Sequence, residues 1–273
     1  MTRKAALSGE PSLRERLHYV ARTLASEHPS IYLPFARRKY KDPSPEVIGP
    51  ATQVVIDGYT RSASTFAVYA FQLAQEQPVP MAHHLHAPAQ LIAAAKAELP
   101  TIAVIREPEA AVLSHVAREP DVGLRDALWS YARFYSRLLP YRSGFVVADF
   151  DEITTDFGAV TRHLNAQFGT SYGEFEHTAD NVERCLALMK ERSKLPQALL
   201  AFESGTATLD EAWEAIRAMP AESREQPDAW VPSDRRSQDK EALRRLWAEP
   251  RLDDVKRRAA DAYLRFTQRD SLA

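Results

Sequence analysis

The pattern of hydrophobic and polar positions along the chain changes near residue 52. Downstream of it, short apolar runs rich in β-branched residues alternate with segments of helical periodicity. The apolar runs cover residues 53–57, 78–84, 101–105 and 145–150. The segments predicted as helices next to them cover 64–75, 87–99, 109–118 and 125–139. Apolar runs separated by helices indicate a parallel sheet covered on both faces, so the pattern predicts an α/β fold with three layers.

The flanking regions are predicted to be helical. Leu13, Leu17, Val20 and Leu24 recur at helical spacing and predict an amphipathic helix over 11–27. The Pro-punctuated stretch 31–50 is predicted to be an irregular arm. Helical patterns follow the last apolar run at 156–168, 180–193, 208–219 and 238–267. The Pro- and Ser-rich stretch 219–237 predicts a loop or lid.

These patterns indicate one domain over residues 1–273. It divides into a helical arm (1–50), an α/β core (52–168) and a helical remainder (169–273).

Composition excludes several classes of protein. Of the 273 residues, 45% are hydrophobic and 26% are charged, which is ordinary for a globular protein. The net charge of −2 gives no reason to expect a nucleic-acid partner. The only cysteine, Cys185, excludes an internal disulfide and a Cys-rich zinc site. No apolar run approaches the ~18–20 residues of a membrane span, and the polar start is no signal peptide, so we expect a cytoplasmic protein without a membrane span.

Glycine is scarce, with nine residues in the chain, about half the number that the average usage of ~7% would give. A glycine-strewn nucleotide fingerprint is therefore not expected. One glycine, however, follows the first predicted strand, in the sequence Gly58-Tyr59-Thr60-Arg61-Ser62-Ala63-Ser64-Thr65.

This segment has the outline of a phosphate-binding loop, with Ala63 at the second glycine and Ser64 at the lysine. A tight strand-to-helix turn points the backbone N–H groups of residues 61–65 at one anion, and the helix N-terminus adds partial positive charge. Hydroxyl groups and Arg61 add further donors. Because the lysine that serves a triphosphate is missing, the loop favours a phosphate outside a Mg-triphosphate. The alternative is a Ser/Thr-capped helix without a ligand.

Two further segments carry candidate chemistry at predicted strand ends. His83, His84 and His86 follow the second strand, where one histidine could act as a general base. Their spacing lacks a helical i, i+4 pair, so no metal is expected, and ordinary turn and core histidines are the alternative. Arg106 ends the third strand, and Ser114 follows it in the next helix. Together these two make a phosphate clamp, and a structural ion pair of Arg106 with Glu107 or Asp151 is the alternative.

Taken together, these segments resemble the sulfotransferases that use 3′-phosphoadenosine 5′-phosphosulfate (PAPS). The sequence GYTRSASTF (58–66) is similar to that family's 5′-phosphosulfate loop, and AVIREPEAAVLSHV (103–116) to its 3′-phosphate motif. His84-Leu85 lies 22 residues before Arg106, where cytosolic members carry the base histidine. VVADFDEI (146–153) is similar to the strand and acidic turn that follow. Arg61, Ala63 and Phe66 stand where the family usually has lysine, glycine and tryptophan.

The resemblance implies a P-loop-like fold and a PAPS-dependent transferase that releases adenosine 3′,5′-bisphosphate (PAP) without a metal. His84 would be the general base, with His83 and His86 as reserve candidates, and Arg61 would stabilise charge on the bridging oxygen. The acceptor would be a small molecule or a carbohydrate. The residues that the resemblance assigns to the donor are Thr60, Arg61, Ser62, Ala63, Ser64, Thr65, Phe66, Arg106, Ser114, Arg235 and Arg236. Two other functions stay open: a P-loop small-molecule phosphotransferase, and a non-catalytic nucleotide- or anion-binding module.

Overall fold

A four-stranded parallel sheet forms the centre of the molecule. The computed structural model describes residues 11–40, 46–192, 197–218 and 234–268, of which 234–237 without their side chains. The strands are β1 (Val54–Gly58), β2 (Met81–His83), β3 (Thr101–Ile105) and β4 (Val146–Asp149). Their order in the sheet is β2-β1-β3-β4, and every neighbouring pair is parallel. All four predicted strands are therefore confirmed, and their carboxyl ends share one edge of the sheet, where ligands bind in open parallel sheets.

Helices cover both faces of this sheet, because successive strand side chains point to opposite sides. Val55 and Ala103 pack on one side against α5 (Pro88–Lys96), α7 (Leu124–Leu138) and α14 (Asp253–Thr267). Ile56 and Val104 pack on the other side against α4 (Ser64–Leu73) and α9 (Phe157–Phe168), and α10 (Ala179–Arg192) packs on α4. The predicted α/β architecture is thus confirmed.

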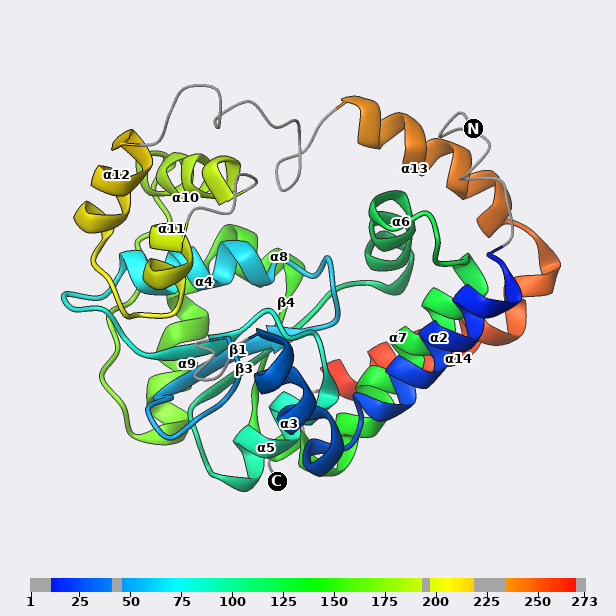
Figure 1. Ribbon diagram of the computed structural model, residues 1–273, viewed down its shortest axis with the longest axis horizontal. Helices are drawn as coiled ribbons and strands as arrows, with labels where there is room; N and C mark the ends of the chain where they lie inside the picture. The colour runs from blue at the N-terminus through cyan, green and yellow to red at the C-terminus, as the bar shows by residue number, and fades with distance from the viewer. Residues whose placement is uncertain (1–10, 41–45, 193–196, 219–233, 269–273) are drawn as a thin grey trace.

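Further helices complete the described part of the chain (Figure 1). They are α2 (Leu13–Ala25), α3 (Pro29–Tyr40), α6 (Pro108–Arg118), α8 (Phe150–Thr155), α11 (Gln197–Glu203), α12 (Leu209–Ala218) and α13 (Asp234–Trp247), with 3-10 turns at Leu139–Gly144 and Pro250–Leu252. In Figure 1, α10, α11 and α12 lie together beyond α4 at the upper left, and α13 runs along the upper right. Within the described residues, no helix combines the length and the apolar character that crossing a bilayer requires.

Three predictions about the flanking regions are wrong in part. The segment 31–40 belongs to α3, although it contains Pro34, because Tyr32, Leu33 and Ala36 are buried against α5 and the core. Helix α11 was not predicted.

The stretch expected as one helix over 238–267 is two helices, since Pro250 opens a 3-10 turn between them. The predicted loop 219–237 lies outside the described residues up to 233, and its last four residues belong to α13. Helix α2 is confirmed, but Leu13, Leu17 and Leu24 on its apolar stripe are exposed.

Candidate functional site

The loop between β1 and α4 has the backbone of an anion-binding turn. Gly58 ends β1 where a side chain has no room, since an added Cβ would collide with the carbonyl group of Val104 on β3. Arg61 and Ala63 have φ values of 68° and 73°, in the left-handed region, and α4 begins directly afterwards at Ser64. Ala63 thus takes a conformation that normally favours glycine, and the loop closes with alanine at this position.

Buried aromatic side chains hold the start of this loop. The Tyr59 N–H donates to the Tyr135 hydroxyl at 3.2 Å, and that hydroxyl donates to the Val104 carbonyl at 2.8 Å. The Tyr59 side chain is buried, and its hydroxyl lies 2.8 Å from Nδ1 of His115. Burial raises the pKa of Tyr59 well above its usual range, so its hydroxyl stays protonated. The sequence analysis missed these anchors because Tyr135 and His115 come from helices far along the chain.

The two serines of the loop have hydroxyl groups without partners. Ser62 Oγ and Ser64 Oγ are buried, and neither makes a hydrogen bond to any described residue. Ser62 faces the Tyr135 hydroxyl, which donates to the Val104 carbonyl oxygen and accepts from the Tyr59 N–H. Ser64 opens the ten-residue helix α4, and Ala63 before it provides no side-chain cap. Unpaired donors at a helix N-terminus are suited to an anion, and leaving them buried without a partner is costly.

The predicted phosphate clamp meets this loop. Nε of Arg61 donates to Oγ of Ser114 at 3.2 Å, and Nη1 of Arg106 donates to the Arg61 carbonyl oxygen at 3.2 Å. The Arg106 guanidinium lies 3.8 Å from the centroid of the Phe150 ring. Burial lowers the pKa of Arg106, and the nearby carboxylates Glu107 and Asp151 oppose this shift. The structure therefore brings together three residues that the sequence analysis had placed in two separate motifs.

The ion pair weighed as the alternative for Arg106 does not occur among the described residues. Neither Glu107 nor Asp151 lies within ion-pair distance of its guanidinium; Glu107 instead caps α6 by accepting from the backbone N–H groups of Glu109 and Ala110. Arg106 is therefore held by the loop and by an aromatic face, and no carboxylate is bonded to it.

The other predicted donor residues have different surroundings. Thr65 belongs to the first turn of α4 and is described below with His84. Thr60 lines a cavity next to the loop. Phe66 is buried and packs edge-on against Phe175, with ring centroids 6.2 Å apart, which puts its aromatic face in the core beside the loop. Arg235 and Arg236 lie in the first turn of α13, and their side chains are outside the described part of the structure.

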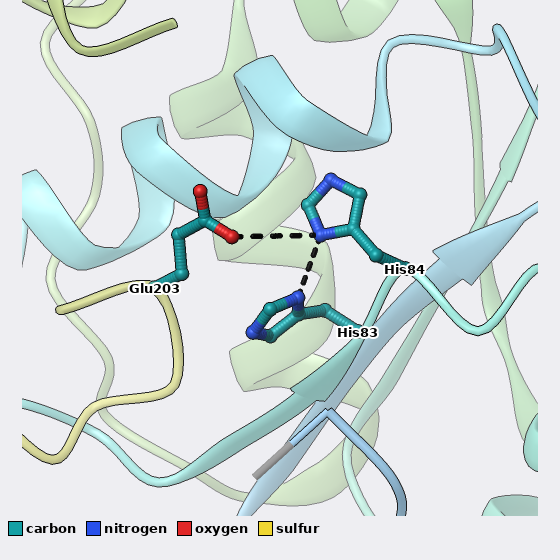
Figure 2. Close-up of side chains that lie close together, drawn as sticks. All are labelled: His83, His84 and Glu203. Atoms are coloured by element: carbon teal, nitrogen blue, oxygen red, sulfur yellow. Dashed lines mark hydrogen bonds and ion pairs between the residues drawn. The ribbon is translucent and has the colours of Figure 1, made fainter. Parts of the chain in front are cut away.

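His83 and His84 lie at the end of β2, with their rings perpendicular and their Nδ1 atoms turned toward each other (Figure 2). Their Nδ1 atoms are 2.6 Å apart. Nε2 of His84 lies 3.0 Å from Oγ1 of Thr65 on the loop side, and Nε2 of His83 lies 3.2 Å from Oγ of Ser204. Burial lowers the pKa of His83 to about 3 and that of His84 well below its usual range, with the charge of Arg192 adding to both shifts. Both rings are therefore neutral near pH 7.

A buried carboxylate completes this cluster. Glu203, at the end of α11, points toward His84 in Figure 2, and its Oε2 lies 3.9 Å from His84 Nδ1. Its other oxygen, Oε1, accepts from Nε of Arg192 at 2.6 Å and from the hydroxyl of Tyr69. Burial raises the pKa of Glu203, and the charge of Arg192 opposes this. The sequence analysis missed Glu203 because it lies in a helix that was not predicted, about 120 residues after the histidines.

His86 is oriented differently from its two neighbours. Its Nδ1 lies 2.8 Å from the carbonyl oxygen of Gly58 and 3.4 Å from Oδ1 of Asp57. Both oxygens accept, so Nδ1 carries the proton and Nε2 is left as the acceptor. Asp57 is completely buried and also accepts from the backbone N–H of His86 and from Gln90. The contact between His86 and Asp57 was not predicted. The aspartate at the end of the first predicted strand is the only feature of the sequence that pointed to it.

The cavity next to the loop has a volume of about 90 Å³ and mixed polar and aromatic walls. Helix α2, the loop and helix α7 line it, and the side chain of His86, 25% exposed, reaches it beside Thr60. The His84 side chain, 6% exposed, is not part of its lining. Among the described residues, no hydrogen bond occupies Nε2 of His86. The site thus combines a loop with two unpartnered serine hydroxyls at a helix N-terminus and the His86 imidazole at the edge of a small cavity.

Comparisons of the chain with family models, with curated proteins and with solved structures find no match in any of the three.

Proposed function

We propose that this protein is a sulfotransferase with a P-loop-like donor site, which transfers the sulfuryl group of PAPS to a hydroxyl or amine of a small-molecule or carbohydrate acceptor. One observation carries the proposal. Arg61, Arg106 and Ser114, from two separate motifs, converge on one loop whose buried serine hydroxyls have no partner. An anionic donor satisfies these groups together.

Each donor contact has a separate role. The backbone N–H groups of residues 61–65 and the hydroxyls of Ser64 and Thr65 receive the 5′-phosphosulfate. Arg106 and Ser114 receive the 3′-phosphate, for which the planar guanidinium supplies paired donors. Arg61 stabilises the negative charge that develops on the oxygen bridging phosphorus and sulfur.

The transfer is an in-line substitution at sulfur. The acceptor oxygen or nitrogen forms a bond to sulfur while the bond from sulfur to the bridging oxygen breaks, and PAP leaves with the electron pair. The acceptor's proton passes to a histidine. His84 is the base by resemblance, and its Nε2 lies against Thr65 of the donor loop. The geometry favours His86, because its Nδ1 is held by Gly58 and Asp57 while its Nε2 is open toward the cavity.

A phosphotransferase that uses Mg-ATP is disfavoured. Ser64 stands where a P-loop has its lysine, so no positive charge reaches the β- and γ-phosphates from that position. Calorimetric titration separates the two functions. We expect PAP to bind and Mg-ATP to bind weakly or not at all. Tight binding of Mg-ATP without binding of PAP would contradict the proposal and favour the phosphotransferase.

Variants locate the donor site. Arg106→Ala should weaken PAP binding by about 2–4 kcal/mol, at least roughly 30-fold, the range for a lost charge-assisted phosphate contact. Arg162→Ala is the matched control. Arg162 is on α9, and its guanidinium forms an exposed ion pair with Glu174 at 2.7 Å. Equal PAP affinity in the two variants would remove Arg106 from the donor site.

Transfer from labelled PAPS to a panel of hydroxyl and amine acceptors tests catalysis. We expect His86→Ala to lose turnover while it keeps PAP affinity, and His84→Ala is assayed beside it. If His84→Ala alone loses turnover, His86 is not the base. PAP binding without transfer to any acceptor would favour the non-catalytic binding module.

A further inference from the structure

The cluster of His83, His84 and Glu203 has the composition of a metal site. One nitrogen of each histidine and one oxygen of the glutamate lie within 4.8 Å of one another. His83 and Glu203 are completely buried, and the side chain of His84 is nearly so. The three groups come from the end of β2 and the end of α11, and Figure 2 shows them turned toward a common point.

The atoms behind the two rings support this arrangement. Nε2 of His83 lies 3.2 Å from Oγ of Ser204, and Nε2 of His84 lies 3.0 Å from Oγ1 of Thr65. Histidines that ligate a metal through one nitrogen usually donate their other N–H to an oxygen, which fixes the tautomer and the ring plane. Both rings here have such an oxygen, and both turn Nδ1 to the centre.

The carboxylate supplies an independent observation. Oε1 of Glu203 is used by Arg192 and Tyr69, whereas Oε2 is buried and has no hydrogen-bond partner. A hydrogen bond between two neutral imidazoles accounts for the 2.6 Å between the Nδ1 atoms, but it leaves Oε2 unpaired. A cation at the centre satisfies both nitrogens and the orphaned oxygen together, which a buried carboxylate oxygen strongly favours.

We propose that His83 Nδ1, His84 Nδ1 and Glu203 Oε2 bind one divalent transition-metal ion of the zinc class. Two imidazoles and one carboxylate suit zinc, whereas Ca²⁺ and Mg²⁺ prefer oxygen ligands throughout. Ligand bonds of about 2.0–2.1 Å at tetrahedral angles put the ligand atoms about 3.3 Å apart. The two Nδ1 atoms now lie 2.6 Å apart and Oε2 lies 3.9 Å from His84 Nδ1, with all three atoms within 4.8 Å of one another, so binding requires the side chains to rearrange around the ion. Glu203 then bears Arg192 on one oxygen and the metal on the other.

Such an ion joins distant parts of the chain. It connects the end of β2 to α11 directly, and through Thr65 it contacts the first turn of α4. The inference does not rest on the sulfotransferase proposal, because it is argued from the contacts of His83, His84 and Glu203 alone. A metal on Nδ1 of His84 leaves His86 as the histidine that accepts the acceptor's proton.

Zinc binding to the full-length protein is the test. The protein is stripped with a chelator, dialysed, and titrated with Zn²⁺ against a competing chromophoric chelator, and Co²⁺ absorption reports the coordination geometry. We expect about one ion per chain and a tetrahedral Co²⁺ spectrum. His84→Ala and Glu203→Gln should abolish both signals. His86→Ala, two residues away in the same segment, is the matched control and should retain them.

Two further measurements keep the test decisive if a ligand variant does not fold. Ser204→Ala removes only the group behind His83 and should weaken zinc binding by about tenfold or more. Zn²⁺ at a hundredfold excess over its Kd should raise the Tm of the wild-type protein by about 5 °C. The absence of stoichiometric zinc and of a Tm rise in the wild type would overturn the proposal. An equal loss of binding in His84→Ala and His86→Ala would do so as well.

Discussion

Replacing Ala63 by glycine tests the conformation of the loop between β1 and α4. Ala63 has a φ of 73°, and the left-handed conformation costs an L-residue about 1–2 kcal/mol. Glycine removes that cost. It also loses more backbone entropy on folding, about 0.5–1 kcal/mol. The net change expected for Ala63→Gly therefore runs from about zero to a stabilisation of about 1.5 kcal/mol.

A matched substitution isolates the conformational part of this effect. Ala260 is exposed in the middle of α14, where Ala260→Gly should cost about 1 kcal/mol by helix propensity. The entropy that glycine loses on folding is common to both variants. The difference between their free energies of unfolding should therefore equal the left-handed cost at residue 63, about 1–2 kcal/mol.

Urea denaturation followed by tryptophan fluorescence measures both variants against the wild type. If Ala63→Gly destabilises the protein as much as Ala260→Gly does, Ala63 is not held in the left-handed region. The loop would then lack the turn that points its backbone N–H groups at an anion, and residues 61–65 would not form the proposed donor site.

Three further predictions concern groups around the site. Arg192→Met removes the ion-pair partner of the buried Glu203 carboxylate and should lower the free energy of unfolding by about 3–5 kcal/mol. In the same urea assay, the double variant with Glu203→Gln should recover part of that loss. Gly58→Ala should lower the free energy of unfolding by about 3 kcal/mol, because the added Cβ meets the Val104 backbone. Gly49→Ala is the control and should be nearly neutral, since its Cβ meets nothing closer than 3.8 Å. Similar urea midpoints for the two variants would contradict this. In the presence of a chelator, lowering the pH from 6.5 to 5.5 should cost about 1 kcal/mol through His83, since its pKa falls from 6.5 in the unfolded chain to about 3 in the fold and only the unfolded chain binds the proton. His83→Gln should lose correspondingly less.

The local part of the fold is predictable from the sequence. Four apolar runs between helical patterns predicted four strands and a parallel sheet, and the structure has them in a single sheet. The loop after β1 and the arginine after β3 were placed correctly at one sheet edge, because parallel strands end on the same side. These features depend on periodicity and on residues close together in the chain.

Tertiary packing determines features that the local sequence pattern does not predict. Helix α3 forms despite Pro34, because burying Tyr32, Leu33 and Ala36 outweighs the hydrogen bond that proline removes. The contact between Arg61 and Ser114 joins residues 53 positions apart, so neither motif alone predicts it.

The role of each histidine was decided in the same way. His83, His84 and His86 are nearly indistinguishable as sequence, yet the first two face Glu203 from a distant helix and the third faces Asp57 beside the cavity. Sequence by itself determined the four strands, most of the helices and where the loop between β1 and α4 lies, because those depend on side-chain periodicity and backbone preference. The tertiary structure alone decided which titratable groups meet, because that depends on how α11 and the strands pack in three dimensions.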